Sequence, residues 1–148
     1  MWREGFTLTL AAWSLNALAL AFGASLGLRG LFEPHWAARR VRLKPDEQGG
    51  GLAEFRAAFG GLLLAAHAAA LFFTVKWIIN AESVVGIFAA GAAAALSAAW
   101  IGAAAGRVLS MLRDNTRTRI NLTRAAVELV LGVLIGAPWA LWNFQIPS

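Results

Sequence analysis

Five charged residues at the ends of apolar stretches could form one ion-pair cluster. They are Glu54, Arg56, Arg107, Arg124 and Glu128. Charged groups in an apolar environment are costly unless they are paired, so we expect Glu128 to pair with Arg107 or Arg56. Arg124 precedes Glu128 by four residues and would lie one turn away on the same helix. Such a cluster could fix helix register, bind an anionic headgroup or another charged ligand, or handle protons through Glu128.

Three polar residues, Asn16, His67 and Ser97, occupy the midpoints of three apolar stretches. A histidine at this depth could relay protons, or bind a quinone headgroup or a metal ion. It could equally donate an interhelical hydrogen bond to Asn16 or Ser97, or face another subunit. Arg56, Gly60 and His67 would share one helical face, because 11 residues advance a helix by almost three whole turns.

The elements that position these residues are four apolar stretches of the length that a membrane-spanning helix needs, about 20 residues. They cover residues 6–28, 57–75, 84–106 and 125–144. The chain is 59% hydrophobic and 14% charged, whereas soluble domains are charged at about a quarter of their positions. We therefore predict the all-α class, a polytopic four-transmembrane-helix bundle formed by residues 1–148 as a single domain. A cleavable signal peptide at the first stretch is the alternative, which its length disfavours.

Positive charge is distributed unevenly between the connections. Of 13 Lys and Arg residues, six lie in 29–56 and five in 107–124. The positive-inside rule places both segments in the cytoplasm, and we expect a bacterial inner-membrane protein with both termini periplasmic. The basic loop 29–56 should meet anionic lipid headgroups. In it, Pro34 at a helix-start position predicts a short basic helix through Leu43, with a solvated loop as the alternative, and 45–51 reads as a flexible link.

Small residues recur at four-residue spacing and predict the seams where helices approach closely. The row in the third stretch is the longest, so we expect that helix to be the most enclosed. Pro138 predicts a kink near Gly136. The rows are Gly23 and Gly27; Ala57, Gly61, Ala65 and Ala69; Gly86, Ala90, Ala94, Ala98, Gly102 and Gly106; and Gly132 and Gly136.

Several kinds of chemistry are disfavoured. The chain has no cysteine and two histidines, which leaves little material for a metal site. Residues 23–27 match the G-x-S-x-G pattern, but inside a helix, where it would be a packing motif. Ser97 and His67 lack a third orienting group for a hydrolase. We expect no cofactor, no nucleic-acid partner and no catalytic residue.

The segments Glu54-Phe55-Arg56-Ala57-Ala58-Phe59-Gly60-Gly61 and Gly106-Arg107-Val108-Leu109-Ser110, with Asp114 and then Glu128, support a resemblance. Together they resemble a family of small bacterial four-helix membrane proteins that is known as a domain of unknown function and is similar to the DoxX-like bundles. The resemblance implies that the family's characteristic positions are Arg56, Gly60, Gly61, Arg107, Ser110, Asp114 and Glu128, which include three residues of the charged cluster. It implies no established activity. The long basic first connection and His67 depart from the family pattern.

The function expected from these features is a non-enzymatic accessory or assembly component of a membrane complex, with a membrane-protein partner or a second copy. The alternative is a protein that binds a small ligand, such as a quinone or a lipid, or handles protons through Arg56, His67, Arg107 and Glu128. A third interpretation, an enzyme acting on a membrane-embedded substrate, has only the midpoint polar residues behind it.

Overall fold

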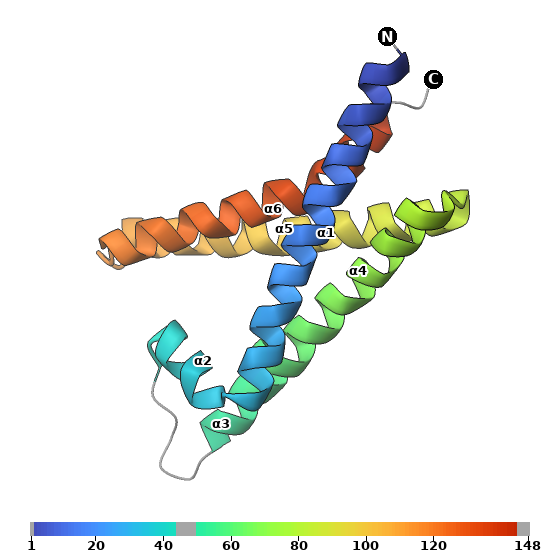
Figure 1. The fold of residues 1–148 in the computed structure, drawn as a ribbon. Coiled ribbons are helices and arrows are strands. Elements are labelled where there is room, and N and C mark those ends of the chain that lie inside the picture. Colours follow the sequence, from blue (N-terminus) through green and yellow to red (C-terminus); the bar gives the residue numbers. More distant parts are fainter. Residues whose placement is uncertain (1, 44–49, 145–148) are drawn as a thin grey trace. The chain divides into compact units, whose positions relative to one another are not determined.

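The computed structural model describes residues 2–43 and 50–144, and within them the regular elements are helices joined by short turns. Side chains are described for residues 8–43 and 50–141. We expected a flexible link at residues 45–51. Of these, residues 45–49 lie outside the described residues. The helices, shown in Figure 1, are α1 (Trp2–Phe32), α2 (Pro34–Val41), α3 (Gly50–Glu54), the π-helix η1 (Phe55–Leu62), α4 (Leu63–Asn80), α5 (Ser83–Arg113) and α6 (Arg119–Phe144).

Four of the helical stretches are long and apolar enough to cross a membrane: Leu8–Phe32, Gly50–Asn80, Ser83–Arg113 and Arg119–Leu141. This confirms the all-α class with four candidate transmembrane helices, as in a multi-pass membrane protein. Each helix is longer than its apolar stretch. Hydropathy marks the part of a helix that matches the hydrocarbon core, whereas backbone hydrogen bonding continues into the interfacial layers.

The chain divides into two compact units that share helices. One contains Met1–Ala19 and Phe73–Ser148, and the other contains Leu20–Phe72. We call them the large unit and the small unit. The helices α1 and α4 contribute one half to each unit. The single domain expected over residues 1–148 stays a prediction.

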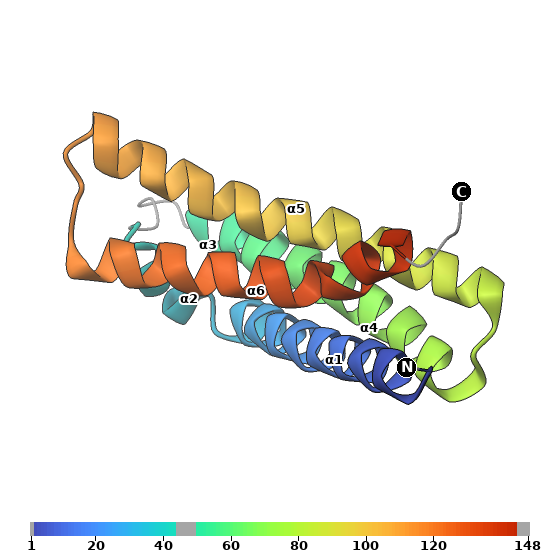
Figure 2. The same ribbon diagram turned by 90° about the horizontal axis from the view of Figure 1, so that it is seen from above.

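In the large unit, α5 and α6 lie antiparallel and side by side, as Figures 1 and 2 both show. The turn between them uses Asn115, whose positive φ of 54° suits an asparagine. The side-chain oxygen of Thr118 accepts the backbone N–H of Asn121 at 3.2 Å and so caps the start of α6. Trp13 is buried with Ala89 and Ala90.

In the small unit, α1 approaches the backbone of η1 and α4 at glycines. A Cβ built at Gly27 would lie 2.7 Å from the Cα of Leu64, and one at Gly60 would lie 2.7 Å from both N and Cα of Leu31. No side chain fits at either position, so glycine is required there by the closeness of two backbones. The short helix α2 forms in the basic connection, as predicted, and ends at Val41.

The small-residue seams are confirmed in part. Gly27 meets Leu64, and Gly132 and Gly136 meet Ser97. The row in the third stretch is wrong beyond its first residues, because nothing lies within 4 Å of a Cβ built at Gly102 or Gly106. Four residues advance a helix by 400°, so a four-residue row drifts by about 40° at each step. It starts on the buried side of α5 at Gly86 and ends on the open side.

The row predicted in the second stretch is also wrong. Ala57, Ala65 and Ala69 are exposed, whereas Gly60 and His67 are buried. The packing side of this helix therefore lies next to the predicted row. Residues 55–62 form a π-helix, in which a four-residue row does not follow one face. Alanine and glycine occur on both sides of the helix, so small size alone did not identify the packing side.

Candidate functional site

A two-point ion pair joins α5 to α6 near one end of the large unit. Arg107 donates from Nε to Glu128 Oε2 at 3.0 Å, and its Nη2 donates to Oε1. The Glu128 side chain is 12% exposed and the Arg107 side chain 29%. The planar guanidinium matches both carboxylate oxygens, so the pair fixes orientation as well as charge. Arg107 and Arg56 were the two partners expected for Glu128, and the structure pairs Glu128 with Arg107.

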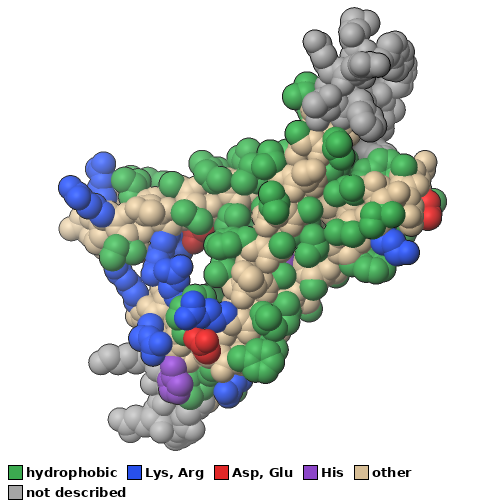
Figure 3. All heavy atoms as spheres, in the orientation of Figure 1, with side chains coloured by type: hydrophobic (Ala, Val, Ile, Leu, Met, Phe, Trp, Pro, Cys, Tyr) green, Lys and Arg blue, Asp and Glu red, His purple; other side chains and the backbone are tan. Residues whose placement is uncertain are grey.

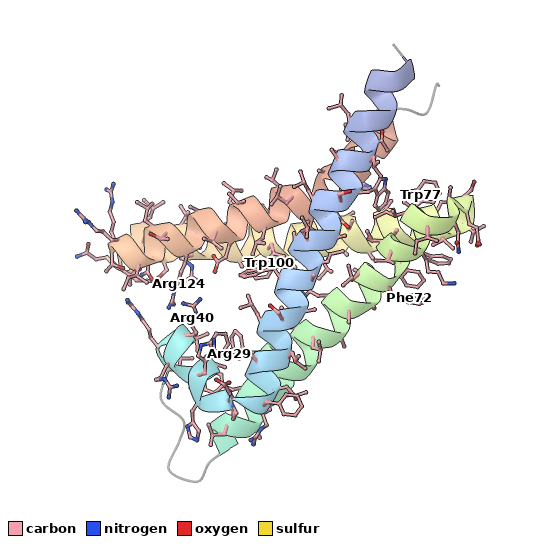
Figure 4. The ribbon with its side chains drawn as sticks, in the orientation of Figure 1. Arg29, Arg40, Phe72, Trp77, Trp100 and Arg124 are labelled. Atoms are coloured by element: carbon pink, nitrogen blue, oxygen red, sulfur yellow. The ribbon has the colours of Figure 1, made fainter. Side chains whose placement is uncertain are left out.

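The remaining charged residues of the predicted cluster have other surroundings. Arg56 is exposed and donates from Nε to the carbonyl of Leu31 at 3.3 Å, near the end of α1. Glu54, the last residue of α3, is exposed. Arg124 lies one turn before Glu128 on α6 and is partly buried (Figure 4). A shared role for these five residues stays a prediction.

Asn16 connects three helices within the large unit. It is fully buried, donates from Nδ2 to the carbonyl of Ile135 at 2.6 Å, and accepts from the hydroxyl of Thr74 at 2.9 Å. Asn16 belongs to α1, Thr74 to α4 and Ile135 to α6. Asn16 was expected, with Ser97, as one of two alternative hydrogen-bond partners of His67, and its hydrogen bonds here are to Ile135 and Thr74.

Pro138 is buried inside α6, in the same turn as Ile135. Proline has no backbone N–H and its ring crowds the carbonyl four residues earlier, which here belongs to Leu134. The carbonyl that Asn16 reaches belongs to the next residue, Ile135, so the missing N–H of Pro138 does not account for this bond.

Ser97 lies at the crossing of α5 and α6. Its hydroxyl donates to the carbonyl of Gly132 at 2.8 Å. A Cβ built at Gly136 would lie 3.0 Å from the Ser97 Cβ. Both glycines therefore make room for the serine, and the polar contact holds the two helices at this distance.

His67 is buried in the small unit, where it is 1% exposed. Its Nδ1–H donates to the carbonyl of Leu63, one turn earlier in α4, at 2.8 Å. The imidazole lies against Gly23 of α1, where any Cβ would meet the ring. Gly60 and Arg56 contact Leu31 of α1, so the expected shared face of Arg56, Gly60 and His67 is confirmed.

The other residues of the family-like motifs lie near the end of α5. The hydroxyls of Ser110 and Thr116 are 3.1 Å apart, and the backbone N–H of Asp114 donates to the carbonyl of Ser110. Asn121 closes the turn by donating to the carbonyl of Thr116 at 2.8 Å. These contacts terminate α5 and start α6. Gly106 contacts nothing within 4 Å of a built Cβ, and Gly61 meets one carbonyl at 3.7 Å.

Sequence reasoning missed Thr74 and the carbonyl of Ile135. A threonine within an apolar stretch was the available signal for the first, and the sequence carries no signal for the second. Every buried side-chain nitrogen and oxygen in residues 8–43 and 50–141 has a hydrogen-bond partner. Within the same part of the chain, no three His, Asp or Glu side chains lie close enough together to hold a metal ion. Of the polar groups at depth, Asn16 and Ser97 form hydrogen bonds to carbonyls of α6.

Comparison with known proteins gives no relative: no protein-family model, no curated protein and no solved structure matches this chain. The resemblance to the DoxX-like bundles stays a prediction.

Proposed function

We propose that this protein is a non-enzymatic accessory or assembly component of a larger complex in the bacterial inner membrane, with both termini periplasmic. It would act by offering one side of α5 to the transmembrane helix of a partner protein or of a second copy. The polar residues at depth support this role, because Asn16, Ser97 and His67 all hold protein groups.

The observation that carries the proposal is a side of α5 lined by small residues, which we call the open face. Its members Gly91, Ala95, Ala98 and Gly102 are all exposed. They recur at intervals of four, three and four residues, so they lie along one line of the helix. A Cβ built at Gly91 or Gly102 has nothing within 4 Å. Small residues let the backbone of another helix approach closely, which is how transmembrane helices associate.

A bulky substitution on the open face tests the proposal. Gly102→Leu should leave the isolated protein as stable as the wild type, because the position has room, and should shift the complex to smaller particles. The measurement is size on a native gel after extraction in styrene–maleic acid particles. Ala126→Leu, at an exposed position of α6, is the matched control and should leave the size unchanged. If wild-type particles contain one copy of this chain and nothing else, the proposal is wrong.

Cysteine cross-linking identifies the partner independently of size. The chain contains no cysteine, so Ala98→Cys and Ala126→Cys each introduce one reactive position. We expect oxidative or bismaleimide cross-links from Ala98→Cys, either to a second copy or to another membrane protein, and a much lower yield from Ala126→Cys. Equal yields from both positions would show random collision and would contradict the proposal.

Two further substitutions separate this role from ligand binding or proton handling. That alternative requires Glu128→Gln or His67→Ala to alter binding or flux while the amount of folded protein stays the same. We expect both variants to lower the amount of folded protein, because Glu128 pairs with Arg107 and His67 packs against Gly23.

A further inference from the structure

Two arginines from different helices lie over the ring of one tryptophan in the small unit. The guanidinium carbon of Arg29, in the last turn of α1, lies 4.5 Å from the ring centroid of Trp36. That of Arg40, one turn along α2 from Trp36, lies 5.6 Å from the same ring. Both distances are within the range of cation–π attraction. Figure 4 shows Arg29 and Arg40 among the side chains gathered between the end of α1 and α2. We call Arg29, Trp36 and Arg40 the arginine clamp.

The buried side of α2 holds the arginine clamp in place. The α2 residues Pro34, Ala37 and Ala38 are buried, and the last two pack with Phe55 at the start of η1. Arg42 ends α2 in the left-handed conformation, with φ 61°. The buried side of the helix therefore fixes the direction in which its basic side points. In Figure 3, Lys and Arg side chains lie over this helix at the surface.

The clamp keeps donors available for a ligand. A guanidinium has five N–H donors, and stacking on an aromatic face leaves its edge free to bind oxygen. Glu33 accepts from Nε of Arg29 at 3.1 Å, so the other nitrogens of that guanidinium remain. The Arg29 side chain is 52% exposed, and Arg40 is also exposed. An arginine fork matches the two anionic oxygens of a phosphodiester, and both guanidinium carbons lie within 5.6 Å of one ring centroid.

The surroundings indicate that the phosphodiester carries acyl chains. Arg29 lies in the candidate span Leu8–Phe32, beside Leu28, which is 49% exposed, and near Phe32, which is 73% exposed. A soluble phosphate gains nothing from such neighbours, whereas the chains of a lipid lie along them. Segment 29–42 contains four arginines and one glutamate, which favours an acidic lipid over a zwitterionic one.

We propose that the arginine clamp binds the headgroup of one acidic phospholipid, with the acyl chains lying along Leu28 and Phe32. This is independent of the open face of α5, so either proposal can fail without the other. Trp36 acts as the platform that sets the two guanidiniums at a fixed separation.

The test is a lipid titration of the purified full chain in mild detergent, read by native mass spectrometry. The probes are dioleoyl-phosphatidylglycerol and dioleoyl-phosphatidylcholine. We expect one phosphatidylglycerol to bind well above the level of phosphatidylcholine. Arg40→Gln should weaken that binding about tenfold, because it removes a charge-assisted hydrogen bond to the phosphate. Trp36→Leu should weaken it at least as much, although it removes no charge.

Arg39→Gln is the matched control, because Arg39 is exposed, lies in the same helix and carries the same charge. It is turned about 100° from Arg40 around the helix, and it should weaken binding less than twofold. Equal effects of Arg39→Gln and Arg40→Gln would show diffuse attraction and overturn the clamp. So would full displacement of the lipid by millimolar inorganic phosphate, or unchanged binding in Trp36→Leu. Thermal unfolding of each variant in the same detergent shows that the protein is folded, and Arg40→Lys, which keeps the charge without the planar fork, should bind at an intermediate level.

Discussion

Gly60 and Gly61 are neighbours in η1 with opposite surroundings, which makes them a matched pair for testing how the small unit is held together. A Cβ at Gly60 would lie 2.7 Å from N and Cα of Leu31 and 3.0 Å from its Cβ. A Cβ at Gly61 would meet the carbonyl oxygen of Arg56 at 3.7 Å, an ordinary contact. Alanine should therefore be accepted at Gly61 and rejected at Gly60.

The size of the effect follows from these distances. An ordinary contact begins at 3.4 Å, so α1 and η1 must separate by about 0.7 Å or more to admit a methyl group at Gly60. The atoms in the way are backbone atoms, which cannot rotate aside. Overpacking of this kind raises the free energy of the folded state by about 1–3 kcal/mol. Replacing glycine by alanine in a helix gains up to about 1 kcal/mol. Because that gain applies to both variants, the difference between them isolates the clash.

The assay is the free energy of unfolding in mixed detergent micelles, followed by circular dichroism. We expect Gly60→Ala to unfold more easily than Gly61→Ala by about 1–3 kcal/mol, and Gly61→Ala to match or exceed the wild type. Leu31→Ala in the Gly60→Ala background should not restore stability, because the closest atoms of Leu31 belong to its backbone. Equal stability of the two single variants, or rescue by Leu31→Ala, would refute the close approach of α1 and η1.

Three further perturbations test the large unit and the topology. Asn16→Ala should lower the free energy of unfolding by about 1–2 kcal/mol, because it leaves two buried groups without their partner. A loss of stability smaller than that of Ser97→Ala would contradict this account. Glu128→Gln should destabilise by about 1–3 kcal/mol, with recovery when the charges of Arg107 and Glu128 are exchanged; failure of the exchange would show that each charge has a further role. A single cysteine at Asn115 should react with a membrane-impermeant maleimide from the cytoplasmic side alone, and labelling of intact cells from outside would reverse the predicted orientation.

The number of spans could be predicted because hydropathy is an average over about 20 residues and does not depend on any one contact. The helix ends could not, since polar residues such as Arg107 and Arg113 continue α5 beyond its apolar part. The basic helix after Pro34 was predicted from one proline and a run of helix-compatible residues, and its end at Val41 differs by two residues from the expected Leu43. The helix ends because the backbone of Arg42 adopts the left-handed conformation. Nothing in the sequence predicts this conformation.

The site was predicted in its residue types better than in its partners. Glu128 could be assigned to an arginine because a carboxylate near hydrocarbon needs a cation, but choosing Arg107 required knowing that α5 and α6 are adjacent. Asn16 was recognised as a buried polar group, whereas its partner Thr74 is 58 residues away. A long-range hydrogen bond depends on the rotation of each helix about its axis. An error of one residue changes that rotation by 100°, and composition does not fix it.

Both units hold helices together by close approach at glycine, at Gly27 and Gly60 in the small unit and at Gly132 and Gly136 in the large unit, and the large unit adds polar side chains. In the small unit, Gly27 and Gly60 allow backbones to touch, so the contact depends on the absence of side chains and rejects any added atom. In the large unit, Asn16 and Ser97 reach a carbonyl across the interface, so the contact depends on the presence of a side chain and is lost when atoms are removed. Enlarging substitutions at these glycines should therefore destabilise either unit, whereas truncation of Asn16 or Ser97 should destabilise the large unit. The open face of α5 follows neither pattern, because Gly91 and Gly102 accept enlargement without a clash within the large unit, and an effect of enlargement there would report on a neighbour outside that unit.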